Sequence, residues 1–290
     1  MPDPAARIAV IGGSGFYEMA ALTEREEWRP ITPFGEPSSA ITLGQLHGTP
    51  VAFLLRHGSG HFLTPGEIPV RANIWALKSL GVQGIISVSA VGSLQEAIAP
   101  SHMVVPDQII DRTRGDRPFS FFSDGIVAHV GFADPFCPDL SERLATAGDA
   151  LGQTMHRGGT YICMEGPLFS TRAESQMYRS WGASIIGMTA VPEAKLAREA
   201  EIAYAMLATA TDYDVWHETE ADVTADAVLQ TLLRNVDTAK QIVSDLVRDL
   251  PEGWESTAKG ALANAIVTDP ARIPLRVRHD LAPIVGRYLE

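Results

Sequence analysis

Short apolar runs rich in valine, isoleucine and leucine alternate with longer helical patterns along most of the 290 residues of this sequence. Runs of this kind are typical of buried strands, and strands that are each followed by a helix favour parallel pairing. The sequence therefore predicts an α/β fold, a single domain with a central mixed, mostly parallel β-sheet flanked by helices. The expected strands cover residues 8–11, 40–43, 51–55, 84–89, 103–108, 185–188 and 203–211.

Helical patterns fill the gaps between these runs. Thr171 stands three residues before Glu174, the spacing of a capping box, so a helix is expected to begin there. Pro192 fits the first turn of another helix, where its missing N–H costs little. Further helices are expected over residues 72–80, from residue 138, and from 224 to about 250, where apolar residues recur at three and four positions.

The chain changes character after residue 250. Residues 1–250 are expected to form the main domain. Prolines interrupt the short helical pieces of residues 251–290, which we expect to be a C-terminal helical appendage packed on the core.

The charge balance and the cysteine content exclude several classes of protein. The formal net charge is −12, so the sequence lacks the basic excess that a nucleic-acid interface would need. The two cysteines, Cys137 and Cys163, have the spacing of neither a disulfide framework nor a zinc site. No apolar run reaches the roughly 18 residues of a membrane span, and no secretory signal is visible. We therefore expect a cytoplasmic protein that uses no metal and binds neither nucleic acid nor membrane.

The first apolar run breaks into the glycine turn "GGSG", which contains Ser14. A dinucleotide fingerprint would need a third glycine where Glu18 stands, and a triphosphate-binding loop would need a lysine that this turn lacks. Backbone N–H groups and the Ser14 hydroxyl could instead hold a small oxyanion such as phosphate. A plain strand-to-helix turn is the alternative.

Polar side chains follow other apolar runs at the point where each run ends. Arg56 and His57 follow one of them, and a guanidinium there can grip an oxyanion with two parallel hydrogen bonds. A structural arginine paired with an acidic residue is the alternative. Ser89 and Thr189 end two further runs. Because ligands gather at the carboxyl ends of parallel strands, we expect these residues to form a phosphate cup.

Asp212 and Asp214 close the last apolar run. Two carboxylates at this spacing project to the same side of an extended chain. If both are partly buried, their like charges repel each other and raise the pKa of a carboxyl group in the pair. A carboxylic acid that keeps or shares its proton can assist a leaving group. A solvated acidic loop is the alternative.

Nine motifs together resemble the trimeric purine nucleoside phosphorylase family. They are "IGGSGF", "TPFGEPS", "RHGSGH", "RANIWALKSLG", "SAVGSL", "DPFCP", "EGPLFSTRAE", "GMTAVPEAKLARE" and "ATDYDVW", and their order and spacing make the match specific from about residue 8 to 250. The resemblance implies the fold of that superfamily and a reaction in which phosphate attacks the anomeric carbon of a purine nucleoside. It is strongest for members that convert S-methyl-5'-thioadenosine to adenine and 5-methylthioribose 1-phosphate, a step of purine and methionine salvage.

The resemblance also implies roles for individual residues, with inorganic phosphate as a co-substrate and no cofactor. It places Asp212, Arg56 and His57 in catalysis, and a trimer in which the residue matching His129 reaches in from a neighbouring subunit. Leu168 departs from the family pattern, which often has arginine there. The phosphate ligands would be Ser14, Arg56, His57, Ser89, Ala90 and Thr189, and the nucleoside contacts would be Phe169, Ser170, Met188, Asp212, Asp214, Val223, Val228 and His129.

The identity of the base follows from the acidic pair. A carboxylate accepts a hydrogen bond from a 6-amino group, and family members that act on 6-oxopurines resemble this sequence but carry asparagine at the position of Asp212. Adenine nucleosides are therefore expected. Two alternatives stay open: a phosphorylase of adenosine or another 5'-modified nucleoside, and a noncatalytic nucleoside-binding subunit.

Overall fold

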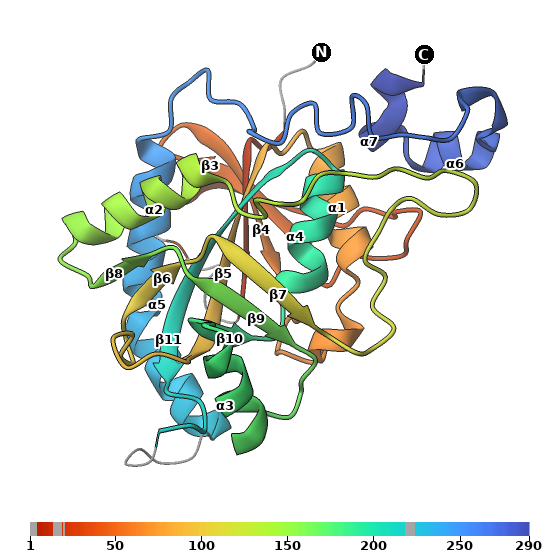
Figure 1. Cartoon of the computed structure of the whole chain (residues 1–290). Helices are drawn as coiled ribbons and strands as arrows, with labels where there is room; N and C mark the ends of the chain where they lie inside the picture. The colour runs from red at the N-terminus through yellow and green to blue at the C-terminus, as the bar shows by residue number, and fades with distance from the viewer. Residues whose placement is uncertain (1–4, 14–18, 20, 218–223, 290) are drawn as a thin grey trace.

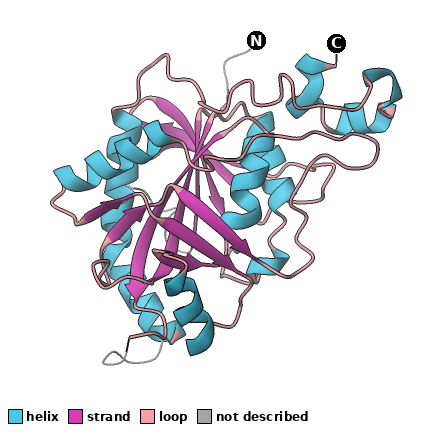
Figure 2. Ribbon diagram, in the orientation of Figure 1, coloured by secondary structure: helices cyan, strands magenta, loops and turns pink. Residues whose placement is uncertain are grey.

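The computed structural model describes residues 5–13, 19, 21–217 and 224–289, and two of the expected site residues, Ser14 and Val223, lie outside them. Figures 1 and 2 show a twisted central sheet with helices on both of its faces. The strands are β1 (Ile8–Gly12), β2 (Thr23–Trp28), β3 (Ile41–Leu46), β4 (Thr49–Leu55), β5 (Gly84–Ser93), β6 (Met103–Val105), β7 (Gln108–Arg112), β8 (Met155–Arg157), β9 (Thr160–Met164), β10 (Ile185–Gly187) and β11 (Ala203–Asp212).

Helices connect these strands and cover them. Thr171 and Glu174 form the expected capping box at the start of α3. The helices are α1 (Val70–Ser79), α2 (Pro138–Ala150), α3 (Arg172–Ser180), α4 (Ala190–Glu199), α5 (Ala225–Arg248), α6 (Leu275–Asp280) and α7 (Ala282–Val285), with 3-10 turns at Pro65–Glu67, Pro270–Arg272 and Gly286–Tyr288.

The sheet is mixed and mostly parallel, as the sequence predicts. Its main path runs β2-β3-β4-β1-β5-β10-β9-β7, while β11 pairs with β5 and β6, and β8 pairs with β6. Pairing is parallel between β1 and both β4 and β5, between β5 and β11, and between β9 and both β7 and β10. The antiparallel pairs among the described strands are β2 with β3, β3 with β4, β5 with β10 and β6 with β11.

Alternate residues of the central strands face two separate hydrophobic cores. In β1, Ala9 and Ile11 pack into the core that includes residues of α1 and α4, while Ile8 and Val10 pack into the core with α2 and α5. The side chains of β11 divide in the same way. A strand that is buried on both faces reads as a continuous apolar run, which is why these strands were recognisable in the sequence.

Some elements differ from the expectation. Pro106 separates the expected strand at 103–108 into the short strand β6 and the beginning of β7. Strands β2, β8 and β9 were not expected. Of these, β9 has a usable signal, because its residues "TYICM" are β-branched or apolar and lie between two glycine-containing turns.

The C-terminal residues cross the top of the sheet in Figure 1 and end in α6 and α7 beside α1. Leu262, Leu281 and Val285 belong to the same hydrophobic core as α1 and α4. A search of the described residues found no helix with the length and apolarity needed to span a membrane.

Strand β5 changes partners along one edge. Residues 84–87 pair with β1 on that edge, and residues 92–93 pair with β10, whereas residues 88–91 pair only with β11 on the other edge. The sheet is therefore forked at the middle of β5. This fork is the place where a cavity opens.

Candidate active site

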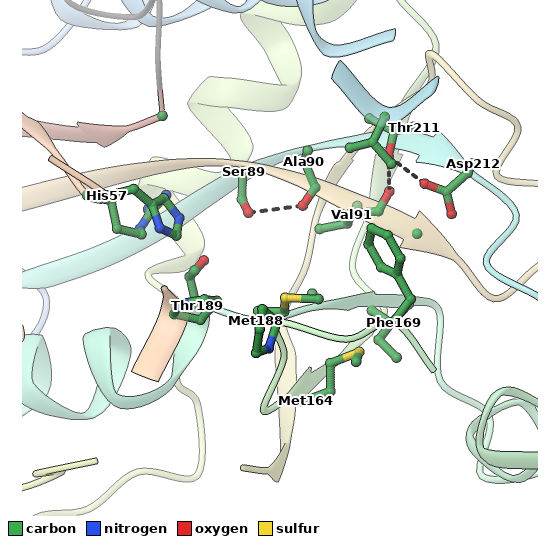
Figure 3. Close-up of a pocket in the computed structure, with 18 of the residues that line it drawn as sticks. His57, Ser89, Ala90, Val91, Met164, Phe169, Met188, Thr189, Thr211 and Asp212 are labelled. Carbon is green, nitrogen blue, oxygen red and sulfur yellow. Dashed lines mark hydrogen bonds between the residues drawn. The ribbon is translucent and has the colours of Figure 1, made fainter. Parts of the chain in front are cut away.

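A cavity of about 310 Å³ lies at the fork of the sheet. This volume is within the range of small-molecule sites. Figure 3 shows residues from several strand ends around it: His57 after β4, Ser89 to Val91 in β5, Thr189 after β10 and Asp212 in β11. The ends of β4, β10 and β11 that the sequence singled out surround one cavity, whereas Ser89, expected at the end of a strand, lies in the middle of β5, because the strand continues to Ser93. Its lining also includes Gly13, Arg56, His61, Met164, Phe169, Met188, Thr211, Asp214, Val228 and Val236.

One end of the cavity carries the expected phosphate ligands. His57, Ser89 and Thr189 lie around it in Figure 3. The Ser89 hydroxyl donates to the Ala90 carbonyl at 3.2 Å. The Thr189 hydroxyl is buried and has no hydrogen-bond partner among the described residues. Because buried polar groups are nearly always paired, this free hydroxyl suits a bound oxyanion.

Arg56 is held by an ion pair. Its Nε and Nη2 atoms donate to the two carboxylate oxygens of Glu193 at 2.9 and 3.1 Å, and both side chains are almost fully buried. Burial is the largest single influence and lowers the pKa of Arg56, but the charge and hydrogen bonds of Glu193, with smaller contributions from Tyr204 and Tyr161, together outweigh it and raise that pKa.

The remaining contacts of Arg56 are also internal. Its guanidinium donates to the Val88 carbonyl at 3.0 Å and to the Ser87 hydroxyl at 2.7 Å. The structure thus contains the acidic partner that the sequence left as an alternative. Arg56 nevertheless lines the cavity, and its contact with phosphate stays a prediction.

His57 is neutral and held in one tautomer. Its Nδ1 lies 2.9 Å from the carbonyl oxygen of Leu63, which can only accept, so Nδ1 carries the proton. Burial, together with the nearby charge of Arg56, lowers the pKa of His57 to about 4. Its ring stacks on that of His61 with centroids 4.1 Å apart. At neutral pH, His57 therefore has an unprotonated Nε2 that can accept a hydrogen bond.

We expect His57 to make the fold sensitive to acid. The pKa of His57 is lowered from 6.5 to about 4 in the folded chain, so between these values the unfolded chain binds more protons. The stability due to neutral His57 is present above pH 6.5 and is lost as the pH falls toward 4. Thermal melts across this pH range should show a smaller fall in melting temperature for His57→Gln than for wild type. His279→Gln is the control, because His279 is exposed, and its melting temperature should fall as much as that of wild type. If the melting temperature of His57→Gln also fell as much as that of wild type, the expectation would be contradicted.

The opposite end of the cavity is acidic. Asp212 accepts a hydrogen bond from the Thr211 hydroxyl at 2.7 Å, shown in Figure 3, and another from the Asp214 N–H at 2.8 Å. Burial raises the pKa of Asp212, and it also raises the pKa of Asp214. Both carboxyl groups line the cavity instead of standing in solvent. The arrangement favours a carboxyl group that keeps or shares a proton.

Apolar side chains complete the space between the two ends. Phe169 and Met188 face it in Figure 3, and Val228 and Val236 come from α5. Phe169 is 41% exposed, so it lies at the mouth of the cavity. Flat and apolar surfaces of this kind suit a base and a sugar with an apolar substituent.

Two expected nucleoside contacts do not line the cavity in the single chain. Ser170 is buried next to it, with its hydroxyl 3.6 Å from the sulfur of Met164. His129 lies in the segment that bridges to the C-terminal residues, where its N–H donates to the Ala265 carbonyl. The contribution of His129 to a nucleoside site stays a prediction.

Two further polar residues near the cavity were not recognised from the sequence. Glu193 follows Pro192 in an apolar helix segment, and an acidic residue at a core position is a signal that was available. Arg117 follows β7 in an irregular segment and has no pattern that distinguishes it from a surface arginine. Both were missed because their partners are distant in sequence.

The chain is similar to known proteins over almost its whole length. The profile of the Phosphorylase superfamily matches residues 7–248. S-methyl-5'-thioadenosine phosphorylase of Chloroflexus aurantiacus is 58% identical, covering 98% of this chain and 98% of the relative. That of Geobacter sulfurreducens is 54% identical, covering 97% of this chain and 99% of the relative.

Solved structures are similar as well. A methylthioadenosine phosphorylase from an antarctic soil metagenomic library has a TM-score of 0.92 and 52% identity, covering 97% of this chain and 99% of its own. Methylthioadenosine phosphorylase from Schistosoma mansoni, in complex with adenine, has a TM-score of 0.80 and 32% identity, covering 97% and 98%.

Proposed function

The chain belongs to the phosphorylase superfamily, and we propose that it uses inorganic phosphate to split S-methyl-5'-thioadenosine into adenine and 5-methylthioribose 1-phosphate. The observation that carries the proposal is the cavity, which joins a free Thr189 hydroxyl at one end to the Asp212 carboxyl at the other. Relatives with more than half of their residues identical, over almost the whole length, carry the name of this activity.

The reaction needs a negative charge beneath the sugar. Cleavage of the glycosidic bond passes through a cationic, oxocarbenium-like sugar, which a phosphate held in a water-poor cavity stabilises before attacking it. We assign phosphate to the end with His57, Ser89 and Thr189. Holding nucleophile, sugar and base in line removes an entropic barrier of up to about 7–11 kcal/mol in the best intramolecular reactions.

The departing adenine needs a proton at N7. Asp212, whose pKa is raised by burial, is the group that we assign to deliver or share it. The same carboxyl end accepts from the 6-amino group of adenine. A 6-oxopurine would leave polar groups unpaired there, and such a mismatch discriminates by about 10⁴ or more.

The apolar residues Val228 and Val236 favour a methylthio group at the 5' position over a hydroxyl. Apolar contacts of this size discriminate weakly, by about 1–3 kcal/mol for one methylene. Adenosine is therefore the second candidate substrate, and it would use the same phosphate and base contacts.

We expect adenine release from S-methyl-5'-thioadenosine only when phosphate is present. The test incubates the protein with S-methyl-5'-thioadenosine, adenosine or inosine, each with and without phosphate, and follows the free base by chromatography. Inosine is the matched control for the 6-amino group. Release without phosphate would indicate a hydrolase, and no release from any nucleoside would indicate a noncatalytic binding subunit.

We also propose a trimer, in the cytoplasm, in which His129 completes the 5' end of a neighbouring cavity. This assignment rests on the family resemblance, and His129 does not line the cavity of its own chain. Light scattering coupled to size-exclusion chromatography measures the mass of the assembly. A monomer with full activity would contradict the proposal.

A further inference from the structure

Arg117 lies outside the cavity but ties together two segments that form its wall. Its Nε donates to the Glu165 carboxylate at 3.0 Å, and its Nη2 donates to the Glu165 carbonyl at 2.5 Å, beyond the end of β9. Its Nη1 donates to the carbonyls of Met188 at 2.8 Å and Val191 at 3.0 Å, beyond the end of β10. Arg117 is only 6% exposed, so these contacts are shielded from water.

The peptide group between Met188 and Thr189 is held on both of its sides. Arg117 binds its carbonyl, and the N–H of Thr189 lies 3.5 Å from the hydroxyl of Tyr161, which is fully buried. A Cβ at Gly187 would lie 2.1 Å from that hydroxyl, so this close approach requires glycine. The side chains of Met188 and Thr189 face the cavity in Figure 3. Met188 is the proposed sugar contact and Thr189 is a proposed phosphate contact, so holding this one peptide group positions both.

Glu165 anchors Arg117 in turn. Its carboxylate also accepts from the backbone N–H groups of Arg114 and Gly115, both at 2.9 Å. The turn that carries Arg117 is thereby fastened to the segment that leads to Phe169. A rigid guanidinium fork is needed here, because an ammonium group cannot span a carboxylate and three carbonyls from two segments.

We propose that Arg117 is a positioning residue that sets the Met188–Thr189 peptide group, and with it the alignment of phosphate under the sugar. The proposal rests on the proposed function and adds a residue that touches neither substrate. Misplacement of a binding group by about 1 Å can cost about 10²-fold in rate, so a partial loss of this support has a measurable effect.

The test compares Arg117→Lys with Arg198→Lys. Arg198 is a matched control because its guanidinium also donates to backbone carbonyls, those of Gly131 and Asp134, away from the cavity. Calorimetric titration with inorganic phosphate and, separately, with adenine measures the two ends of the site. We expect Arg117→Lys to weaken phosphate binding and to lower kcat/KM for phosphate by about tenfold, with adenine affinity changed less than threefold. Adenine affinity should change less because Asp212 lies on β11, which makes no hydrogen bond to Arg117 among those described above, and because Phe169 lies four residues beyond Glu165, at the mouth of the cavity.

A merely structural role would give a different pattern. In that case Arg117→Lys would lower the melting temperature as Arg198→Lys does and leave both affinities unchanged, which would overturn the proposal.

Tyr161→Phe keeps the proposal testable if Arg117→Lys does not fold, because it removes only the hydroxyl on the other side of the same peptide group. It should weaken phosphate binding in the same direction, and unchanged phosphate affinity would count against the proposal. The phosphate titration tests the role of Arg117 and does not depend on which nucleoside is cleaved. The proposed function is tested separately, by the release of free base from each nucleoside with the wild-type protein.

Discussion

Asp212→Asn is expected to lower kcat for S-methyl-5'-thioadenosine at least tenfold, and general acid–base groups typically contribute about 10²–10⁴-fold. The carboxyl group lies at the end of β11, lines the cavity and has a pKa that burial raises. Asparagine keeps the size of the side chain but cannot deliver a proton to N7. The measurement is steady-state release of adenine at saturating phosphate and nucleoside.

Glu199→Gln is the matched control for this change. Glu199 is also a largely buried carboxyl group, with a pKa that burial raises to about 7, but it accepts hydrogen bonds from Ser120 and the Phe121 N–H, away from the cavity. Its neutralisation should leave kcat within about twofold, an effect of less than 0.5 kcal/mol on the barrier. Unchanged turnover in Asp212→Asn would remove Asp212 from the mechanism.

Glu193→Ala is expected to lower the free energy of unfolding by about 3–5 kcal/mol, because it leaves the buried charge of Arg56 without its partner. The side chains of Arg56 and Glu193 are 2% and 1% exposed, so water cannot replace the lost contact. The Tyr204 hydroxyl, which donates to Glu193 at 2.8 Å, loses its acceptor as well. Chemical denaturation followed by circular dichroism measures the change.

Glu142→Ala provides the comparison, since Glu142 pairs with Arg157 at the surface and exposed pairs contribute about 0–1 kcal/mol. Replacing both buried partners, as Arg56→Met with Glu193→Met, should recover much of the stability lost in Glu193→Ala. If Glu193→Ala were no more destabilising than Glu142→Ala, another group would have to compensate the charge of Arg56.

The sequence predicted those features that depend on neighbours along the chain. The continuous apolar runs of β1, β5 and β11 identified the buried strands, because each strand is covered on both faces. The positions of Asp212 and Thr189 followed directly, since each ends or follows such a strand. The rule for carboxyl ends of parallel strands accounts for Asp212, because β11 is parallel to β5. Thr189 reaches the same cavity for another reason: β10 runs antiparallel to β5, so its carboxyl end points back toward the fork.

The features that the sequence did not predict depend on distant contacts. Arg56 and Glu193 are separated by 137 residues, and Arg117 is 71 residues from Met188. A single sequence contains no local pattern for such pairs. Strand β8 is only three residues long, too short for an alternation to be recognised.

The fork in β5 places the cavity within the hydrogen-bonded framework of the protein. Strands β1 and β10 approach the same edge of β5 but leave residues 88–91 between them without a neighbouring strand on that edge. A nucleoside and phosphate bound there, as we propose, would contact both groups of strands and act as a non-covalent cross-link between the N-terminal and C-terminal parts of the sheet. By mass action, each co-substrate thus adds to the stability of the folded chain whenever its concentration exceeds its dissociation constant.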